Sequence, residues 1–234
     1  MTTIQQNISR IHEDISKVCQ KAGRDPKDIT LIAVTKFAPV EAIQEAVDCG
    51  ITDIAENKVQ EGLKKYPALK ASQSKGILKR HLIGHLQTNK VKDALKIFDL
   101  IQSVDSLKLA QEIEKQTQKL NRSADILVQV NISGEEQKFG ADQSESLRLI
   151  EEILQLKNIQ IQGLMTMAPF TEDQKIIRDC FRGLRELKNQ VNEKFQGHPN
   201  LQMKFLSMGM SGDYAIALEE GSNMLRIGSA IFKS

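Results

Sequence analysis

The sequence predicts an α/β protein built as a single (β/α)8 TIM barrel over residues 1–234. Eight short apolar segments alternate with segments whose apolar residues repeat at helical spacing. Several of the short segments are apolar on both faces, as parallel strands covered by helices should be. A chain of 234 residues is long enough for one such barrel, and no stretch rich in Pro, Gly and Ser marks a second domain.

The predicted elements begin with an amphipathic helix whose apolar face carries Ile4, Ile8, Ile11, Ile15 and Val18. We expect this extra helix to fill the outer ring beside a short last helix, because the chain ends soon after the eighth strand. The predicted strands are residues 29–35, 53–55, 81–84, 100–104, 126–131, 161–165, 202–206 and 224–227.

Helix signals lie between these strands. Pro39 suits the first turn of a helix after strand one, and Ser106 is a typical N-cap for a helix over 107–120. A further short helix is expected over 213–220. An open doubly wound sheet is the alternative fold, but no glycine-rich dinucleotide fingerprint follows the first strand.

Composition excludes several classes of function. Hydrophobic residues are 40% and charged residues 26%, with a net charge of +2, and no basic tract indicates a nucleic-acid partner. No apolar run approaches membrane-spanning length. The three cysteines are scattered without zinc-ligand spacing, which favours a reducing, cytoplasmic location and predicts no metal site.

Lys36 closes the most apolar early segment, Ile29 to Lys36. An ammonium is costly to desolvate, and desolvation lowers the pKa of a lysine, which makes its amine a nucleophile toward carbonyls. Lys36 is therefore a candidate for a Schiff base. A lysine that only extends out of the strand end into solvent fits the same pattern.

Polar residues and glycines gather at the other predicted strand ends, where barrels place their active sites. Ser207 and Ser211 follow strand seven, and Gly228 and Ser229 follow strand eight. Hydroxyls and backbone N–H groups at the last two strands are typical of a phosphate site, although two ordinary tight turns would look alike.

Three further side chains at this rim have two readings each. Arg226 could donate to a heterocyclic nitrogen or an anion, or could pair with a barrel carboxylate such as Glu56. His85 could stack on a planar ligand or be a satisfied rim histidine. Asn57 could bind a ligand hydroxyl or start the next helix.

The residues at the rim resemble those of a known family, the pyridoxal phosphate homeostasis proteins (YggS- or PROSC-like proteins). This family is similar to the barrel domain of alanine racemase, which is fold-type III of the pyridoxal 5'-phosphate (PLP) enzymes. The segments that carry the resemblance occur in the family's order and span nearly the whole chain: 33–36, 56–61, 81–90, 206–211 and 226–232.

The resemblance implies that Lys36 holds PLP as a Schiff base and that Arg226 faces its pyridine nitrogen. It also implies that Asn57 and His85 lie near the ring. The implied phosphate contacts are Ser207, Gly228 and Ser229, with Ser211 as a weaker candidate. The chain departs from the family pattern at Ala55, at Gly212 and in its short tail.

The implied function is a monomeric, cytoplasmic PLP-binding protein that acts in PLP homeostasis by buffering the cofactor and delivering it to apo PLP-dependent enzymes. An arginine at the ring nitrogen supports carbanion chemistry weakly. The only tyrosines, Tyr66 and Tyr214, lie on no predicted strand, so no partner base for racemisation is evident. A weak amino-acid racemase is the alternative, and a Schiff-base aldolase for sugar phosphates is a third reading. The rim lysines Lys58, Lys90 and Lys138 could offer a second site for the aldehyde.

Overall fold

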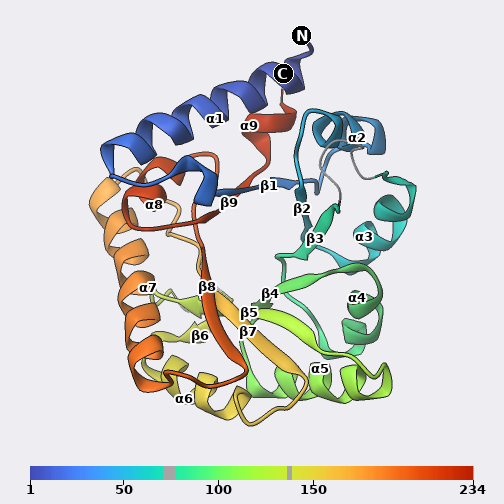
Figure 1. Ribbon diagram of the computed structural model, residues 1–234, viewed down its shortest axis with the longest axis vertical. Helices are drawn as coiled ribbons and strands as arrows, with labels where there is room; N and C mark the ends of the chain where they lie inside the picture. The colour runs from blue at the N-terminus through green and yellow to red at the C-terminus, as the bar shows by residue number, and fades with distance from the viewer. Residues whose placement is uncertain (71–76, 136–138, 234) are drawn as a thin grey trace.

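The computed structural model describes residues 1–70, 77–135 and 139–233. Figure 1 shows a ring of strands enclosed by helices, with the two ends of the chain close together beside α1. Lys138, one of the rim lysines considered above, lies outside the described residues. Of the helices in the described part of the chain, none combines the length and the apolarity that crossing a membrane requires.

The strands form a closed parallel barrel. Hydrogen-bonded neighbours follow the order β4-β3-β2-β1-β9-β8-β7-β5, and β5 pairs again with β4. A two-residue strand, β6 (Ala141–Asp142), adds to β5 outside this ring. The barrel strands are β1 (Thr30–Val34), β2 (Asp53–Glu56), β3 (Lys79–Leu82), β4 (Leu100–Val104), β5 (Ala124–Asn131), β7 (Ile159–Met165), β8 (Leu201–Ser207) and β9 (Met224–Ile227).

Helices cover the outside of the barrel. They are α1 (Thr3–Lys21), α2 (Val40–Asp48), α3 (Val59–Lys65), α4 (Val91–Ile97), α5 (Leu107–Lys119), α6 (Gln143–Ile153), α7 (Gln174–Lys194), α8 (Tyr214–Glu219) and α9 (Ser229–Phe232). Short 3-10 turns span Pro26–Asp28, Tyr66–Ala68 and Thr88–Lys90.

The predicted extra N-terminal helix is confirmed as α1. It contacts α2, α8 and α9, and in Figure 1 it runs alongside the short α9. Ile8, Ile11, Ile15 and Cys19 are buried on its inner face. Because α9 has only four residues, α1 supplies the apolar cover that a longer last helix would give to this side of the ring.

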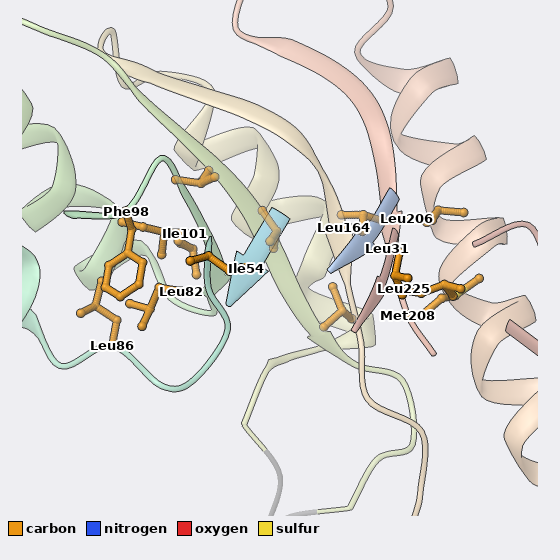
Figure 2. Close-up of a cluster of buried hydrophobic side chains, with 14 of the residues drawn as sticks. Leu31, Ile54, Leu82, Leu86, Phe98, Ile101, Leu164, Leu206, Met208 and Leu225 are labelled. Atoms are coloured by element: carbon orange, nitrogen blue, oxygen red, sulfur yellow. The ribbon is translucent and has the colours of Figure 1, made fainter. Parts of the chain in front are cut away.

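Strand side chains alternate between the two faces of the sheet, and two separate cores follow from this. The large core lies between strands and helices, and Figure 2 shows part of it, including Leu31, Ile54 and Leu82. The small core contains only residues in strands or directly after them, which places it inside the barrel. Its buried members are Ile32, Ala55, Leu100, Leu127, Met165 and Met224.

The (β/α)8 prediction is confirmed, and the predicted spans of β4 and β9 match the structure. Ser106 caps α5 as expected, its Oγ accepting from the backbone N–H of Leu109. Pro39 lies one residue before its predicted place, as the N-cap of α2. Strand β6 was not predicted, because two residues are too few for a periodic signal.

Candidate functional site

A cavity of about 740 Å³ opens at the carboxyl ends of the strands. A pocket of this size suits a small-molecule ligand. Its lining includes seven of the eight predicted site residues: Lys36, Asn57, His85, Ser211, Arg226, Gly228 and Ser229. Residues from five separate strand ends and their loops therefore meet at one place.

Lys36 reaches the cavity because of its register. It lies two residues beyond Val34 and four beyond Ile32, so it continues the inward-facing series of β1 past the strand end. Its side chain is exposed at the mouth, and its ammonium lies 5.3 Å from the centre of the Phe37 ring. The sequence left open a desolvated lysine and one that extends into solvent, and the structure shows an exposed amine where a ligand entering the cavity would meet it.

Arg226 forms part of the cavity floor and is 3% exposed. Its Nη1 donates to Oγ of Ser207 at 2.7 Å, and its Nη2 donates to the backbone oxygen of Thr166 at 2.8 Å. Burial lowers the pKa of Arg226 to about 10, while the charge of Asp213 opposes that change. The guanidinium is therefore a charged donor at neutral pH, held by two uncharged acceptors.

Glu56 does not pair with Arg226, which answers the alternative raised by the sequence. Glu56 follows Ala55 on β2 and points to the opposite, helix-facing side of the sheet. There its Oε1 accepts from Nζ of Lys65 at 2.8 Å and from the hydroxyl of Thr35 at 2.9 Å. Arg226 is left to act toward the cavity.

Two hydroxyls and a helix start lie at the C-terminal side of the cavity. Oγ of Ser229 donates to Oγ of Ser211 at 3.1 Å, and the backbone N–H of Ala230 also points to Ser211 Oγ, at 3.4 Å. Gly228 precedes them, and a Cβ added there would lie 3.3 Å from the backbone oxygen of Val34. Ser229 is exposed, so this group is open to a ligand.

Ser207 differs from the expectation. Its side chain is fully buried inside the barrel below Arg226 and does not line the cavity. Its Oγ accepts from Arg226 and donates to Oε1 of Gln102 at 2.6 Å. With its single proton committed to Gln102, this hydroxyl supports Arg226. Of the two serines predicted to reach the cavity, only Ser211 lines it.

Asn57 and His85 lie in the loops after β2 and β3, which touch at Gly84. A Cβ on Gly84 would lie 2.2 Å from the backbone oxygen of Asn57, so only glycine fits there. His85 stacks on Phe139 with ring centroids 4.4 Å apart and an interplanar angle of 16°. Its Nδ1 is 3.6 Å from Oδ2 of Asp105.

A buried ion pair behind Lys36 was not predicted. Nζ of Lys65 donates to the backbone oxygen of Thr35 at 3.0 Å and contacts that of Lys36 at 3.5 Å, besides its bond to Glu56. Lys65 is 9% exposed and belongs to α3. It holds the main chain at the point where Lys36 leaves the strand. A lysine on the apolar face of a helical pattern was the available signal.

Comparison with known proteins identifies the family of the chain. Residues 6–234 match the family model for the alanine racemase N-terminal domain. A pyridoxal phosphate homeostasis protein from Aquifex aeolicus is 41% identical over 227 residues, covering 97% of this chain and 96% of the relative. The protein of the same name from Escherichia coli K12 is 35% identical, covering 99% of this chain and 97% of the relative.

Solved structures show the same fold. PipY of Synechococcus elongatus, in its structure with PLP bound, superposes with a TM-score of 0.79 at 32% identity, covering 94% of this chain and 99% of PipY. Alanine racemase of Clostridium difficile shares the fold, with a TM-score of 0.75 at 18% identity, covering 98% of this chain and 56% of the racemase. The chain thus belongs to the pyridoxal phosphate homeostasis protein family, whose barrel is of the alanine racemase N-terminal type.

Proposed function

We propose that this protein binds pyridoxal 5'-phosphate covalently through the amine of Lys36, as a Schiff base, and acts in intracellular PLP homeostasis. The observation that carries the proposal is one cavity lined by an accessible amine, a buried arginine and a pair of hydroxyls at a helix start. The curated relatives are named for PLP homeostasis, and PipY was solved with PLP bound.

The residues present fit the three functional parts of PLP. The cofactor supplies an electrophilic aldehyde, and the amine of Lys36 is its nucleophilic partner. The pyridine nitrogen is an acceptor, and Arg226 is a permanent donor in the cavity floor. Ser211, Ser229 and the N–H of Ala230 form a group that suits phosphate oxygens, next to Gly228, which also lines the cavity.

A carrier is favoured over a catalyst by the groups around the amine. Neither tyrosine lines the cavity among the described residues: Tyr66 is buried beside Thr35, and Tyr214 bonds to Asp14. Burial raises the pKa of Tyr66 above its usual range, so this hydroxyl stays protonated and is not available as a base at neutral pH. Arg226 at the ring nitrogen would withhold the proton that makes PLP a strong electron sink. We infer a monomeric, cytoplasmic protein that buffers PLP and delivers it to apo-enzymes.

The experiment is an absorbance spectrum of the purified protein with PLP, before and after borohydride. We expect a visible band that borohydride converts into a stable adduct on Lys36, located by peptide mass spectrometry. The band should vanish in Lys36→Ala and persist in the matched variant Lys58→Ala, whose exposed lysine lies just outside the cavity lining. No band in the wild type, or an equal band in Lys36→Ala, would refute the proposal.

The shared barrel of alanine racemase makes a weak amino-acid racemase the second candidate. It predicts that PLP-loaded protein exchanges the α-proton of alanine or serine in deuterated water. Exchange lost in Lys36→Ala would support the racemase. Exchange no faster than with free PLP would exclude the racemase and support the carrier function.

A further inference from the structure

A continuous chain of hydrogen bonds crosses the interior of the barrel and ends on Arg226. Nη1 of Arg226 donates to Oγ of Ser207 at 2.7 Å, and Ser207 donates to Oε1 of Gln102 at 2.6 Å. Nε2 of Gln102 lies 3.0 Å from Nδ1 of His81, whose Nε2 lies 2.9 Å from Oδ1 of Asp53. We call these five residues the interior relay: Asp53, His81, Gln102, Ser207 and Arg226.

The direction of every bond in the interior relay follows from its chemistry. A guanidinium only donates, so Ser207 accepts from Arg226 and must pass its own proton to the amide oxygen of Gln102. The amide nitrogen of Gln102 only donates, so Nδ1 of His81 accepts. The ring proton of His81 then lies on Nε2 and faces the carboxylate of Asp53, which also accepts from the hydroxyl of Thr52 at 2.7 Å.

The interior relay is buried and lies beneath the cavity. Gln102 and Ser207 are 0% exposed, and only Arg226 among the five lines the cavity. Gln102 stands on β4 and Ser207 on β8, strands that are not neighbours in the ring, so their bond spans the barrel interior. Burying polar side chains costs free energy unless each one is hydrogen-bonded. A polar network inside the barrel therefore indicates a functional role.

We propose that Gln102 is a positioning residue for Arg226, acting through Ser207 to aim the guanidinium at the ligand ring. This inference rests on the proposed binding of PLP in the cavity. The bonds to Ser207 and Thr166 fix the plane of the guanidinium. The remaining N–H groups of Arg226 therefore keep one fixed direction. Gln102 keeps the Ser207 proton turned away from Arg226, so that the Ser207 lone pair receives Nη1.

Removing Gln102 would release this arrangement. Without its acceptor, the Ser207 hydroxyl would turn its proton to another partner, and its lone pair would no longer be held toward Nη1 of Arg226. The donor at the ring nitrogen would then be mobile. The ligand would bind more weakly, and its spectrum, which depends on the charge near the ring nitrogen, would shift.

The test compares Gln102→Met with Gln162→Met. Both glutamines are buried on barrel strands and bonded to a polar side chain, but Gln162 bonds to Asp125 and takes no part in the interior relay. We expect Gln102→Met to weaken PLP binding on the order of tenfold and to shift the visible band. Gln162→Met should match the wild type in both readouts at a similar melting temperature.

A double-mutant cycle shows whether Gln102 acts through Ser207. Ser207→Ala should weaken PLP binding about as much as Gln102→Met, and the combined variant should lose no more than Ser207→Ala alone. Additive losses, or a Gln102→Met variant whose affinity and band equal those of Gln162→Met, would overturn the inference while leaving PLP binding intact.

An arm without cofactor separates this inference from the proposed function. The two fixed bonds should give the Nη nitrogens of Arg226 distinct NMR resonances in the cofactor-free protein. Gln102→Met should shift or merge these resonances, and Gln162→Met should leave them in place. Unchanged Arg226 resonances in Gln102→Met would overturn the positioning role whether or not the wild type binds PLP.

Discussion

Arg226 shows how one buried charge can serve a binding site. Burial lowers its pKa only to about 10, so the side chain stays protonated over the whole neutral range. Its two described acceptors are a hydroxyl and a carbonyl, which orient the guanidinium without neutralising it. A carboxylate in either place would have neutralised the positive charge that faces the cavity.

Ser211 tests the phosphate assignment at the level of single atoms. Replacing Ser211 by alanine removes the oxygen that Ser229 and the N–H of Ala230 both address. We expect Ser211→Ala to weaken binding of PLP about ten- to a hundredfold, the equivalent of one hydrogen bond to a charged group. Binding of pyridoxal, which lacks the phosphate, should not change. Fluorescence titration with both ligands measures this, and equal losses for both would place the phosphate elsewhere.

Lys65 tests the buried ion pair behind Lys36. Lys65→Met would leave the carboxylate of Glu56 buried without its cation, and we expect unfolding free energy to fall by about 3–5 kcal/mol. The neighbouring exposed Lys64→Met should cost less than about 0.5 kcal/mol. Urea unfolding measures both.

The cause of that loss is checked by a second substitution. Lys65→Met combined with Glu56→Gln removes the unpaired charge and should be more stable than Lys65→Met alone. If the combined variant is no more stable, the loss comes from packing of the lysine chain and not from the ion pair.

The contact between the loops after β2 and β3 is tested through Gly84. An alanine Cβ at this position would stand 2.2 Å from the backbone oxygen of Asn57, so one loop must move. We expect Gly84→Ala to destabilise the protein by about 1–3 kcal/mol and to weaken PLP binding, because Asn57 and His85 shift with their loops. Gly212→Ala, which meets nothing within 4 Å, is the control for stability by thermal melting. Equal melting temperatures would contradict the close approach.

The strands and most of the site could be predicted from the sequence because both obey short-range rules. Apolar runs mark β1, β4 and β9, and the side-chain period of two carries Lys36 and Arg226 to the inner face. The order of strand ends around a barrel then brings residues far apart in the sequence to one rim. The sequence could not decide between a desolvated and an exposed Lys36, since that depends on how Phe37 and the facing loops pack.

The interior relay and the place of Ser207 needed the structure. Asp53, His81 and Gln102 each stand on an inward position of a short strand, and polar residues there were the available signal. Their hydrogen bonds depend on which strands face each other across the barrel, and no local sequence pattern indicates which strands those are. Ser207 was grouped with Ser211 because both belong to one loop-like motif, although the period of two turns Ser207 inward below Arg226.

At the scale of the whole molecule, the barrel keeps two kinds of core apart. The large core, between strands and helices, is apolar and includes residues of all the long helices, so it can supply the stability of the fold. The small core shares the barrel interior with the interior relay. This division leaves the interior available for the positioning role that we propose for Gln102, because the helices outside pack against the other face of the same strands.

The position of α1 predicts that the whole chain unfolds as one unit. Ile11 is 2% exposed on α1 and belongs to the same core as β1, α8 and α9. Ile11→Ala should therefore lower the unfolding free energy of the entire barrel by about 2–4 kcal/mol. Ile4→Ala, at a half-buried position of the same helix, should cost clearly less. Far-ultraviolet circular dichroism and PLP release, followed together in urea, should give coincident midpoints that shift equally in Ile11→Ala. A separate early transition for α1, with PLP still bound, would show instead that this helix is an independent appendage and that the barrel is stable without its cover.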